Sequence, residues 1–85
     1  MSSEESILDF ERVQKKIFEN SELIYSVEYD KILMELVICF TTGVEYKYFG
    51  VDQQIVDKFC SDESPGRFFN AFFRKGPFKT EKIEK

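Results

Sequence analysis

The stretch that decides the fold is residues 25–49, YSVEYDKILMELVICFTTGVEYKYF. Apolar residues recur at every second position within it, for example at Val27 and Tyr29 and again at Leu36 and Ile38. A two-residue period is typical of β-strands that bury one face. Short connections divide the stretch into three runs, 25–30, 32–40 and 44–49. Because such links are too short for a parallel crossover, we predict a three-stranded antiparallel meander.

The segments on either side of this stretch have the periodicity of helices. In residues 4–19, apolar side chains recur every three or four positions, which predicts an amphipathic N-terminal helix. Residues 52–75 predict two C-terminal helices, with Asp52 capping the first and Ser64 and Pro65 starting the second. The expected fold is therefore α+β: a three-stranded antiparallel meander packed with two C-terminal helices, plus the N-terminal amphipathic helix. The expected divisions are a helical extension at 1–20, a domain at 21–80 and a frayed tail at 81–85.

Composition limits the chain to one small domain and leaves it few groups for catalysis. At 85 residues it builds a single compact core, to which ten Phe and four Tyr bring large apolar areas. The sequence contains no histidine, so the usual general acid or base is missing. Cys39 and Cys60 alone cannot complete a tetrahedral zinc site, and the sequence has no phosphate-binding glycine pattern. We expect a protein that is not an enzyme and carries no metal or cofactor.

Several features of the sequence bear on its location. No apolar run approaches the ~20 residues that span a bilayer, and the start, Met1–Glu5, is acidic where a signal peptide is basic. Two cysteines are fewer than a small secreted domain normally carries. These features favour a cytoplasmic protein that makes no contact with a membrane.

Charge is distributed unevenly along the chain, whose net charge is −4. Residues 1–64 contain 14 acidic and 6 basic side chains, whereas residues 65–85 contain 6 basic and 2 acidic ones. Between 65 and 80 every charged residue is basic: Arg67, Arg74, Lys75 and Lys79. Such asymmetry is typical of a surface that faces a polyanion, although a solvated basic tail has the same composition.

An ordered series of short motifs connects these elements to a known family. It starts with SVEYD at 26–30, continues with FTTGVEYKYFGV at 40–51 and ends with SPGRFFN at 64–70. This series resembles the KTSC domain, a small module found at the C-terminus of some lysyl-tRNA synthetases and as a stand-alone bacterial protein. Asp52 stands where the family usually has proline, and the segment before Ser21 has no counterpart in the family's short form. The synthetase context implies RNA binding as an expectation.

The first functional hypothesis is binding of single-stranded nucleic acid, RNA in particular. Tyr46 and Tyr48 share one strand face, where a base can stack on an exposed ring, and Lys47 lies between them. The other candidate contacts are Arg67, Arg74, Lys75 and Lys79 for phosphates, and Ser64 and Gly66 as the start of a helix with free N–H groups. The alternatives are that both tyrosines pack in the core and that Ser64 is a plain helix cap.

The second hypothesis is a protein-interaction module or inhibitor. A small, acidic, aromatic-rich chain without catalytic groups suits an accessory subunit or a mobile-element protein. The apolar stripe of the predicted helix at 4–19 has to bury against something, and a second copy of the chain would form a homodimer there. The alternative is that this helix covers the open face of its own sheet.

Overall fold

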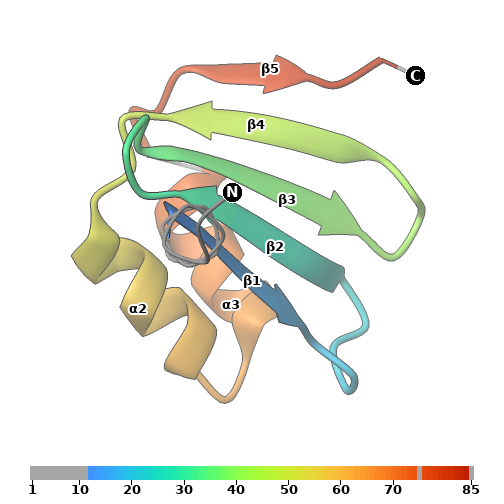
Figure 1. The fold of residues 1–85 in the computed structure, drawn as a ribbon. Helices are drawn as coiled ribbons and strands as arrows, with labels where there is room; N and C mark the ends of the chain where they lie inside the picture. Colours follow the sequence, from blue (N-terminus) through green and yellow to red (C-terminus); the bar gives the residue numbers. More distant parts are fainter. Residues whose placement is uncertain (1–11, 75, 85) are drawn as a thin grey trace, which may run out of the picture.

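The computed structural model describes residues 12–74 and 76–84. They form a small α+β domain in which a five-stranded antiparallel sheet carries its helices on one face (Figure 1). The strands lie side by side in sequence order, from β1 at one edge to β5 at the other. The elements are β1 (Val13–Ile17), β2 (Ile24–Asp30), β3 (Glu35–Phe40), β4 (Glu45–Phe49), α2 (Gln53–Ser61), α3 (Pro65–Phe68), the π-helical turn η1 (Phe69–Phe73) and β5 (Thr80–Lys82).

The predicted meander is confirmed as strands β2, β3 and β4 at the centre of the sheet. Val27 lies opposite Ile38, and Leu36 lies opposite Tyr48. All four side chains are at most 5% exposed, so the two-residue period of the sequence does place one face of the sheet in the core. β3 begins later than predicted because the chain turns just before it, where Met34 adopts a left-handed φ of 57°.

The N-terminal helix predicted for residues 4–19 is wrong at its C-terminal end, where Val13–Ile17 form strand β1. Lys15 lies opposite Glu28 on β2, and Nζ of Lys15 is 3.7 Å from Oε1 of Glu28. The backbone groups at the edge of β2 gain hydrogen bonds from this pairing, and that gain outweighs the weak helical preference of a short segment. Residues 4–11 of the prediction lie outside the described residues.

The tail predicted to be frayed contains a strand as well. Thr80–Lys82 pair with Tyr46–Tyr48 of β4 as strand β5, and the N–H of Ile83 donates to the C=O of Glu45 at 2.9 Å. Three residues with no apolar alternation give no strand signal in the sequence. Pairing with the edge of β4 supplies the hydrogen bonds that decide the conformation.

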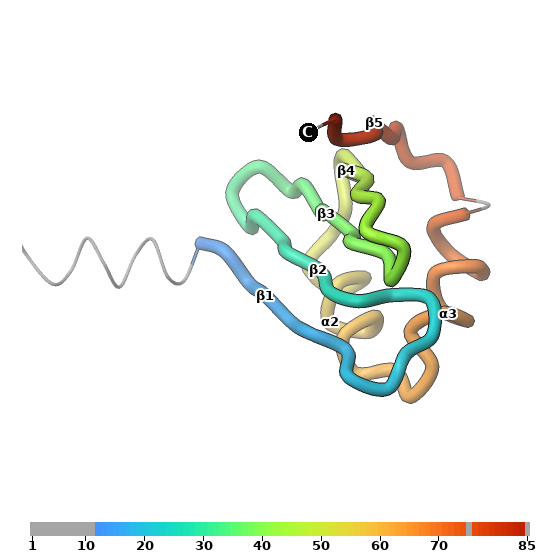
Figure 2. The backbone as a smooth tube through the Cα atoms, turned by 90° about the vertical axis from the view of Figure 1, so that its right-hand side faces the viewer, coloured from blue at the N-terminus to red at the C-terminus, as the bar shows by residue number. Residues whose placement is uncertain are grey.

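The C-terminal helices lie on one face of the sheet (Figures 1 and 2). They bury a cluster of aromatic rings against it. Phe59 of α2 is fully buried, and its ring stacks on Phe68 with the centroids 5.3 Å apart. Phe69 and Phe73 are also buried, whereas Phe72 is 47% exposed. The aromatic group of the second helix is therefore mostly core, and its three buried rings hold that helix against the sheet.

The second predicted helix is shorter than expected and changes geometry part-way. α3 has four residues, and the chain then continues as the π-helical turn η1. The predicted caps Asp52 and Ser64 occupy the N-cap positions, but neither side chain bonds to its helix. Burial holds the start of α2 in place instead, since Val51 and Val56 are both fully buried.

Candidate functional site

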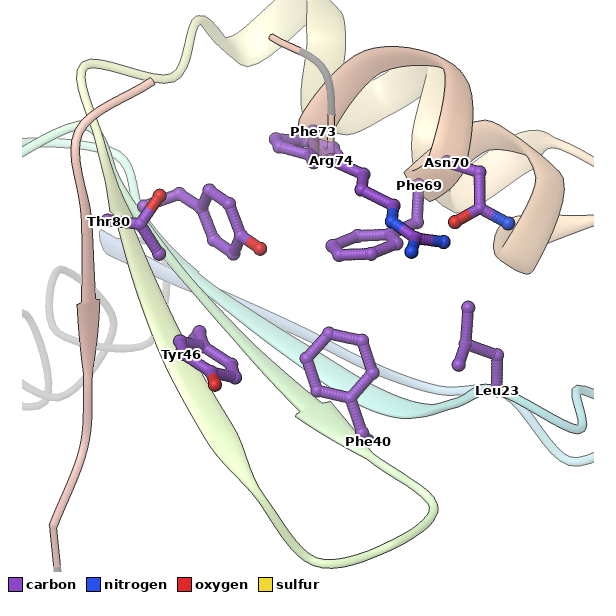
Figure 3. A pocket seen from close by; sticks show the side chains of 9 residues that line it. Leu23, Phe40, Tyr46, Phe69, Asn70, Phe73, Arg74 and Thr80 are labelled. Atoms are coloured by element: carbon purple, nitrogen blue, oxygen red, sulfur yellow. The ribbon is translucent and has the colours of Figure 1, made fainter. Parts of the chain in front are cut away.

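A cavity of about 480 Å³ opens between the β4–β5 side of the sheet and the turn η1. Figure 3 shows that Tyr46, Phe40 and Thr80 approach it from the sheet, while Phe69, Asn70 and Arg74 approach it from the helical side. We call it the aromatic pocket; its lining is Leu23, Phe40, Tyr46, Tyr48, Phe69, Asn70, Phe73, Arg74 and Thr80. Its volume lies within the ~300–1,000 Å³ that is usual for small-ligand sites.

Aromatic rings in edge-to-face contact form the walls of the aromatic pocket. The ring of Phe40 contacts Tyr46 on one side, with centroids 6.0 Å apart, and Phe69 on the other, with centroids 5.1 Å apart. Phe40 and Tyr46 are partly buried, so their rings remain partly accessible from the pocket. Behind them, Tyr48 and Phe73 belong to the buried core and fix the depth of the pocket. The walls are therefore rigid and mostly apolar.

The π-helical turn η1 places two polar side chains at the mouth. The N–H of Arg74 donates to the C=O of Phe69, five residues earlier, at 3.0 Å. This wider turn carries one more residue than an α-helical turn, and such insertions often occur at functional sites. Phe69 and Phe73 thereby face the sheet, while Asn70 and Arg74 are exposed at the pocket edge (Figure 3).

Several polar side chains of the aromatic pocket make no hydrogen bond or ion pair with other described residues. Within the described residues, neither the side chain of Asn70 nor that of Arg74 has a hydrogen-bond or ion-pair partner, and the same holds for the hydroxyls of Tyr46 and Tyr48. The hydroxyl of Thr80 donates to the C=O of Phe78 at 3.2 Å and keeps its acceptor capacity. Donors and acceptors thus converge on one apolar cavity without satisfying one another.

Electrostatics in the pocket favour a neutral Tyr48 and a bound anion. Burial, and then the neighbouring hydroxyl of Tyr46, raise the pKa of Tyr48 above 10.0. Arg74 supplies a permanent positive charge at the mouth. On β5, Lys82 lies directly opposite Tyr46, and cross-strand partners share a face of the sheet. Lys82 is therefore on the same face as Tyr46, although it does not line the pocket.

Three of the residues predicted for nucleic-acid binding meet in this pocket: Tyr46, Tyr48 and Arg74. The ring of Tyr48 is only 5% exposed, so a base cannot stack on it; of the two alternatives left open for this residue, the structure shows packing in the core. The turn η1 decides this, because Tyr48 packs edge-to-face against its residues Phe69 and Phe73. Tyr46 keeps a partly exposed ring.

The other predicted lysines do not line the pocket. Lys47 points to the opposite face of the sheet, where its Nζ lies 3.4 Å from Oε1 of Glu35. Nζ of Lys79 lies 5.9 Å from the ring centre of Phe49, whose place in β4 puts it on the same face as Lys47. Lys75 lies outside the described residues. Arg67 is exposed on α3 and lines neither the pocket nor the hollow next to it.

Ser64 and Gly66, predicted as a phosphate contact, do not line the aromatic pocket. The N–H of Ser64 already donates to Oδ1 of Asp62 at 2.8 Å. Both residues line a second hollow of about 390 Å³, which also contains Glu22 and Glu63. The start of α3 therefore lies beside carboxylates and not beside the cations of the aromatic pocket, and its role as a phosphate contact stays a prediction.

Sequence reasoning missed Phe40, Asn70, Thr80 and Lys82. Asn70 was within the SPGRFFN series, but nothing in its spacing indicated a pocket. Phe40 was predicted to lie in a strand, and the structure places it in the lining of the pocket. Thr80 and Lys82 fell in or beside a segment expected to fray. Thr80 and Lys82 could have been found only if residues 80–82 had been predicted as an edge strand that pairs with β4.

The described residues hold no group of three or more His, Cys, Asp or Glu side chains that could bind a metal ion. Cys39 and Cys60 are free thiols. Burial raises the pKa of the Cys60 thiol, only partly offset by Lys16, so Cys60 is a poor nucleophile. No helix in the described part of the chain is long and apolar enough to cross a membrane.

Comparison with known proteins places this fold in a family. The sequence profile of the KTSC domain matches residues 20–78. The chain belongs to the KTSC domain family. The crystal structure of a KTSC domain protein from Yersinia pestis is similar, with 35% sequence identity and a TM-score of 0.76 over 85% of this chain and 99% of that one. A search among curated proteins finds no match.

The KTSC match covers the central meander and the helices. It includes Tyr46, Asn70 and Arg74 of the aromatic pocket, and it ends before Thr80 and Lys82. β1 also lies outside the matched residues. The pocket therefore combines residues from the matched part of the chain with residues from strand β5 beyond it.

Proposed function

We propose that this protein is a non-catalytic module that binds single-stranded nucleic acid, RNA in preference, through the aromatic pocket. The observation that carries the proposal is the guanidinium of Arg74, which has no partner among residues 12–74 and 76–84, at the mouth of a cavity walled by Phe40, Tyr46 and Phe69. A nucleotide needs this combination, because its base is flat and apolar on its faces and its phosphate is anionic.

The base would enter between the partly exposed rings of Phe40 and Tyr46. Stacking of a base on an aromatic side chain contributes about 1–3 kcal/mol per base and tolerates any base. Its polar edge would face the unpaired groups of the pocket, the amide of Asn70 and the hydroxyls of Tyr46 and Tyr48. These groups can donate and accept, so a base of either hydrogen-bonding pattern finds partners.

The phosphate would lie at the mouth, between Arg74 and Lys82. Both cations come from the basic C-terminal part of the chain, and both are exposed. The many acidic residues elsewhere oppose non-specific binding along a long strand, since the net charge is −4. We therefore expect contact with about two phosphates and a slope of log K against log salt of about −1.4.

Fluorescence anisotropy of labelled single-stranded RNA tests the proposal. The titration is run at low and near-physiological salt with the wild type, Arg74→Gln and the matched control Lys58→Gln. Lys58 is an exposed lysine on α2 that does not line the pocket, so its substitution changes net charge equally. Arg74→Gln should weaken binding about tenfold, the order expected for a charge-assisted contact, and Lys58→Gln should leave it near the wild-type value.

Tyr46→Leu separates stacking from charge. It keeps the apolar volume but removes the ring, so affinity should fall at both salt concentrations without a change in the salt slope. The proposal is wrong if a folded protein binds no RNA at low salt. It is also wrong if Arg74→Gln and Lys58→Gln weaken binding equally, because the attraction would then be a property of net charge alone.

Self-association is a second candidate function, favoured by the turn between β2 and β3. Three consecutive apolar side chains are exposed there: Ile32 at 71%, Leu33 at 53% and Met34 at 36%. Oδ1 of Asp30 accepts the N–H groups of Ile32 and Leu33 at 2.9 and 3.0 Å, which holds the turn in place. We expect sedimentation velocity to show a dimer that Leu33→Ser dissociates. A monomer at every concentration tested would rule this function out.

A further inference from the structure

Among the described residues that line the aromatic pocket, Tyr48 is the buried polar one. It is 5% exposed. The other polar residues of the lining lie nearer to solvent: Tyr46 is half-buried, and Asn70, Arg74 and Thr80 are exposed. Water bonds to exposed polar groups whether or not a ligand is present, so they distinguish ligands only weakly. The hydroxyl of Tyr48 is therefore the group of the pocket with the strongest power to select a ligand.

The packing around Tyr48 fixes the direction of its hydroxyl. The ring packs edge-to-face against Phe69 and Phe73, with centroids 6.1 and 5.2 Å away. On β3, the residue opposite Tyr48 is Leu36, which is fully buried. Because protein cores are close-packed, the ring cannot turn away from the pocket without opening the core.

The hydroxyl of Tyr48 has no hydrogen-bond partner among residues 12–74 and 76–84. In the same part of the chain, no buried side-chain oxygen or nitrogen is both sealed from solvent and unbonded. The hydroxyl therefore reaches the space of the cavity that its residue lines. Tyr29 on β2 is equally buried, yet its hydroxyl donates to the C=O of Val51. Since buried hydroxyls are normally bonded inside the protein, the hydroxyl of Tyr48 points to a ligand as its partner.

The hydroxyl of Tyr48 stays protonated throughout the neutral range. Burial, and then Tyr46, raise the pKa of Tyr48 above 10.0. A neutral hydroxyl donates one hydrogen bond and can also accept, so a carbonyl oxygen, a ring nitrogen or an amino group can bond to it. An apolar ring of the same shape offers none of these atoms. It would leave the hydroxyl unbonded against an apolar surface, which is unfavourable.

We infer that the hydroxyl of Tyr48 is the specificity-determining group of the aromatic pocket: it selects a planar ring with a hydrogen-bonding atom on its inner edge, as every nucleobase has, over an apolar ring of the same shape. The inference rests on the proposed function and assigns recognition of the base edge to one residue. Arg74 then binds the phosphate at the mouth, while Tyr48 contacts the base at the inner end. This role differs from stacking, which the sequence suggested for the ring of Tyr48.

Two labelled oligonucleotides of equal length test the inference by fluorescence anisotropy. One carries thymine bases on a ribose backbone, and in the other an apolar ring of the same shape, difluorotoluene, replaces each thymine. Both are titrated with the wild type, Tyr48→Phe and the control Tyr25→Phe. Tyr25 is 51% exposed and does not line the pocket. The readout is the ratio of the two affinities, because comparing ratios between proteins cancels the difference in hydrophobicity between the two rings.

The affinity ratio of thymine to difluorotoluene should fall roughly fivefold to tenfold in Tyr48→Phe, as expected for the loss of one hydrogen bond. In Tyr25→Phe it should keep the wild-type value. Tyr48→Phe keeps the ring and its packing, so stacking and the charge of Arg74 are not changed by the substitution.

Thermal melts of the free protein test the same hydroxyl without a ligand. Because the hydroxyl of Tyr48 bonds to no described residue, Tyr48→Phe should leave the melting temperature unchanged or raise it. Tyr29→Phe, which removes a hydroxyl with an internal partner, should lower it. A loss in Tyr48→Phe as large as in Tyr29→Phe would show that this hydroxyl has a partner inside the folded protein and would overturn the inference.

The binding outcomes separate this inference from the proposed function. If neither oligonucleotide binds, the proposed function fails and the inference fails with it. If Arg74→Gln weakens binding but the affinity ratio is the same in Tyr48→Phe and the wild type, RNA binding stands and the selective role of Tyr48 is refuted. An equal fall of the ratio in Tyr25→Phe would also refute it, since a hydroxyl outside the pocket would then have the same effect.

Discussion

Removing the hydroxyl of Tyr29 should destabilise the fold without changing the residues that line the aromatic pocket. Tyr29 is 1% exposed, and its hydroxyl donates to the C=O of Val51, which is fully buried. This bond joins β2 to the connection between β4 and α2. In Tyr29→Phe the carbonyl loses its partner in a dry environment, which costs about 1–3 kcal/mol. In a domain of this size, each 1 kcal/mol lowers the melting temperature by roughly 4–8 °C.

Urea denaturation followed by circular dichroism measures the loss. The control is Tyr25→Phe on the same strand, because Tyr25 is 51% exposed and its hydroxyl makes no bond within the described residues. We expect a lower midpoint for Tyr29→Phe, an unchanged m-value and almost no change for Tyr25→Phe. If the two variants are equally stable, the Tyr29 hydroxyl contributes nothing net, and the reasoning from the buried carbonyl is refuted.

The same bond predicts a pH dependence. Burial first, and then Asp52, raise the pKa of Tyr29 above 10.0. Because the folded-state pKa is the higher one, the contribution of this group is complete below pH 10 and is lost as the pH rises through the folded-state pKa. The stability difference between wild type and Tyr29→Phe should therefore be constant near neutral pH and shrink in alkali. A difference that grows in alkali would contradict the sign of this argument.

Three other variants test the packing, the β2–β3 turn and a backbone position. Phe59→Ala removes a fully buried ring that stacks on Phe68 and leaves a cavity. The free energy of unfolding, measured by urea titration, should fall by about 3–5 kcal/mol. A much smaller loss would mean that the core collapses around the cavity. Asp30→Asn should destabilise the protein at neutral pH, because hydrogen bonds to the Asp30 carboxylate, first of all from the N–H of Leu33, lower its pKa. The difference in stability between wild type and variant should vanish as acid protonates Asp30 in the wild type. A difference that persists in acid would exclude the charge of Asp30 as its source. Gly50→Ala should lower the free energy of unfolding by about 1 kcal/mol, because Gly50 has a φ of 70° that alanine rarely adopts. An added Cβ would meet no atom within 4 Å, so the loss would come from the backbone alone. An unchanged melting temperature would mean that the turn relaxes.

The elements predicted correctly are those whose signal is local and repeated. The alternation through β2, β3 and β4 buries every second side chain, and this pattern depends only on neighbours along the chain. α2 was recognisable in the same way, since Val56 and Phe59 lie on one helical face. The KTSC motifs were also readable in order along the sequence, and the match over residues 20–78 confirms them.

The candidate site was only partly predictable. Of the residues predicted for binding, Tyr46, Tyr48 and Arg74 line one cavity, whereas Lys47 lies on the opposite face of the sheet, and their role in binding stays a prediction. A tyrosine on a strand can be buried or exposed, and the rings of Phe69 and Phe73 decide that Tyr48 is buried. No pattern along the chain contains that information, because the packed rings come from an element more than 20 positions away.

By itself, the sequence determined the central meander, the two helices that follow it and the family. These depend on periodicity and motif order, which act over a few residues. Only the tertiary structure decided that β1 and β5 are strands, and that Tyr46, Asn70, Arg74 and Thr80 surround one cavity. The physical reason is that a short edge segment takes its conformation from the backbone hydrogen bonds of its neighbour, and a pocket exists only where distant elements pack together.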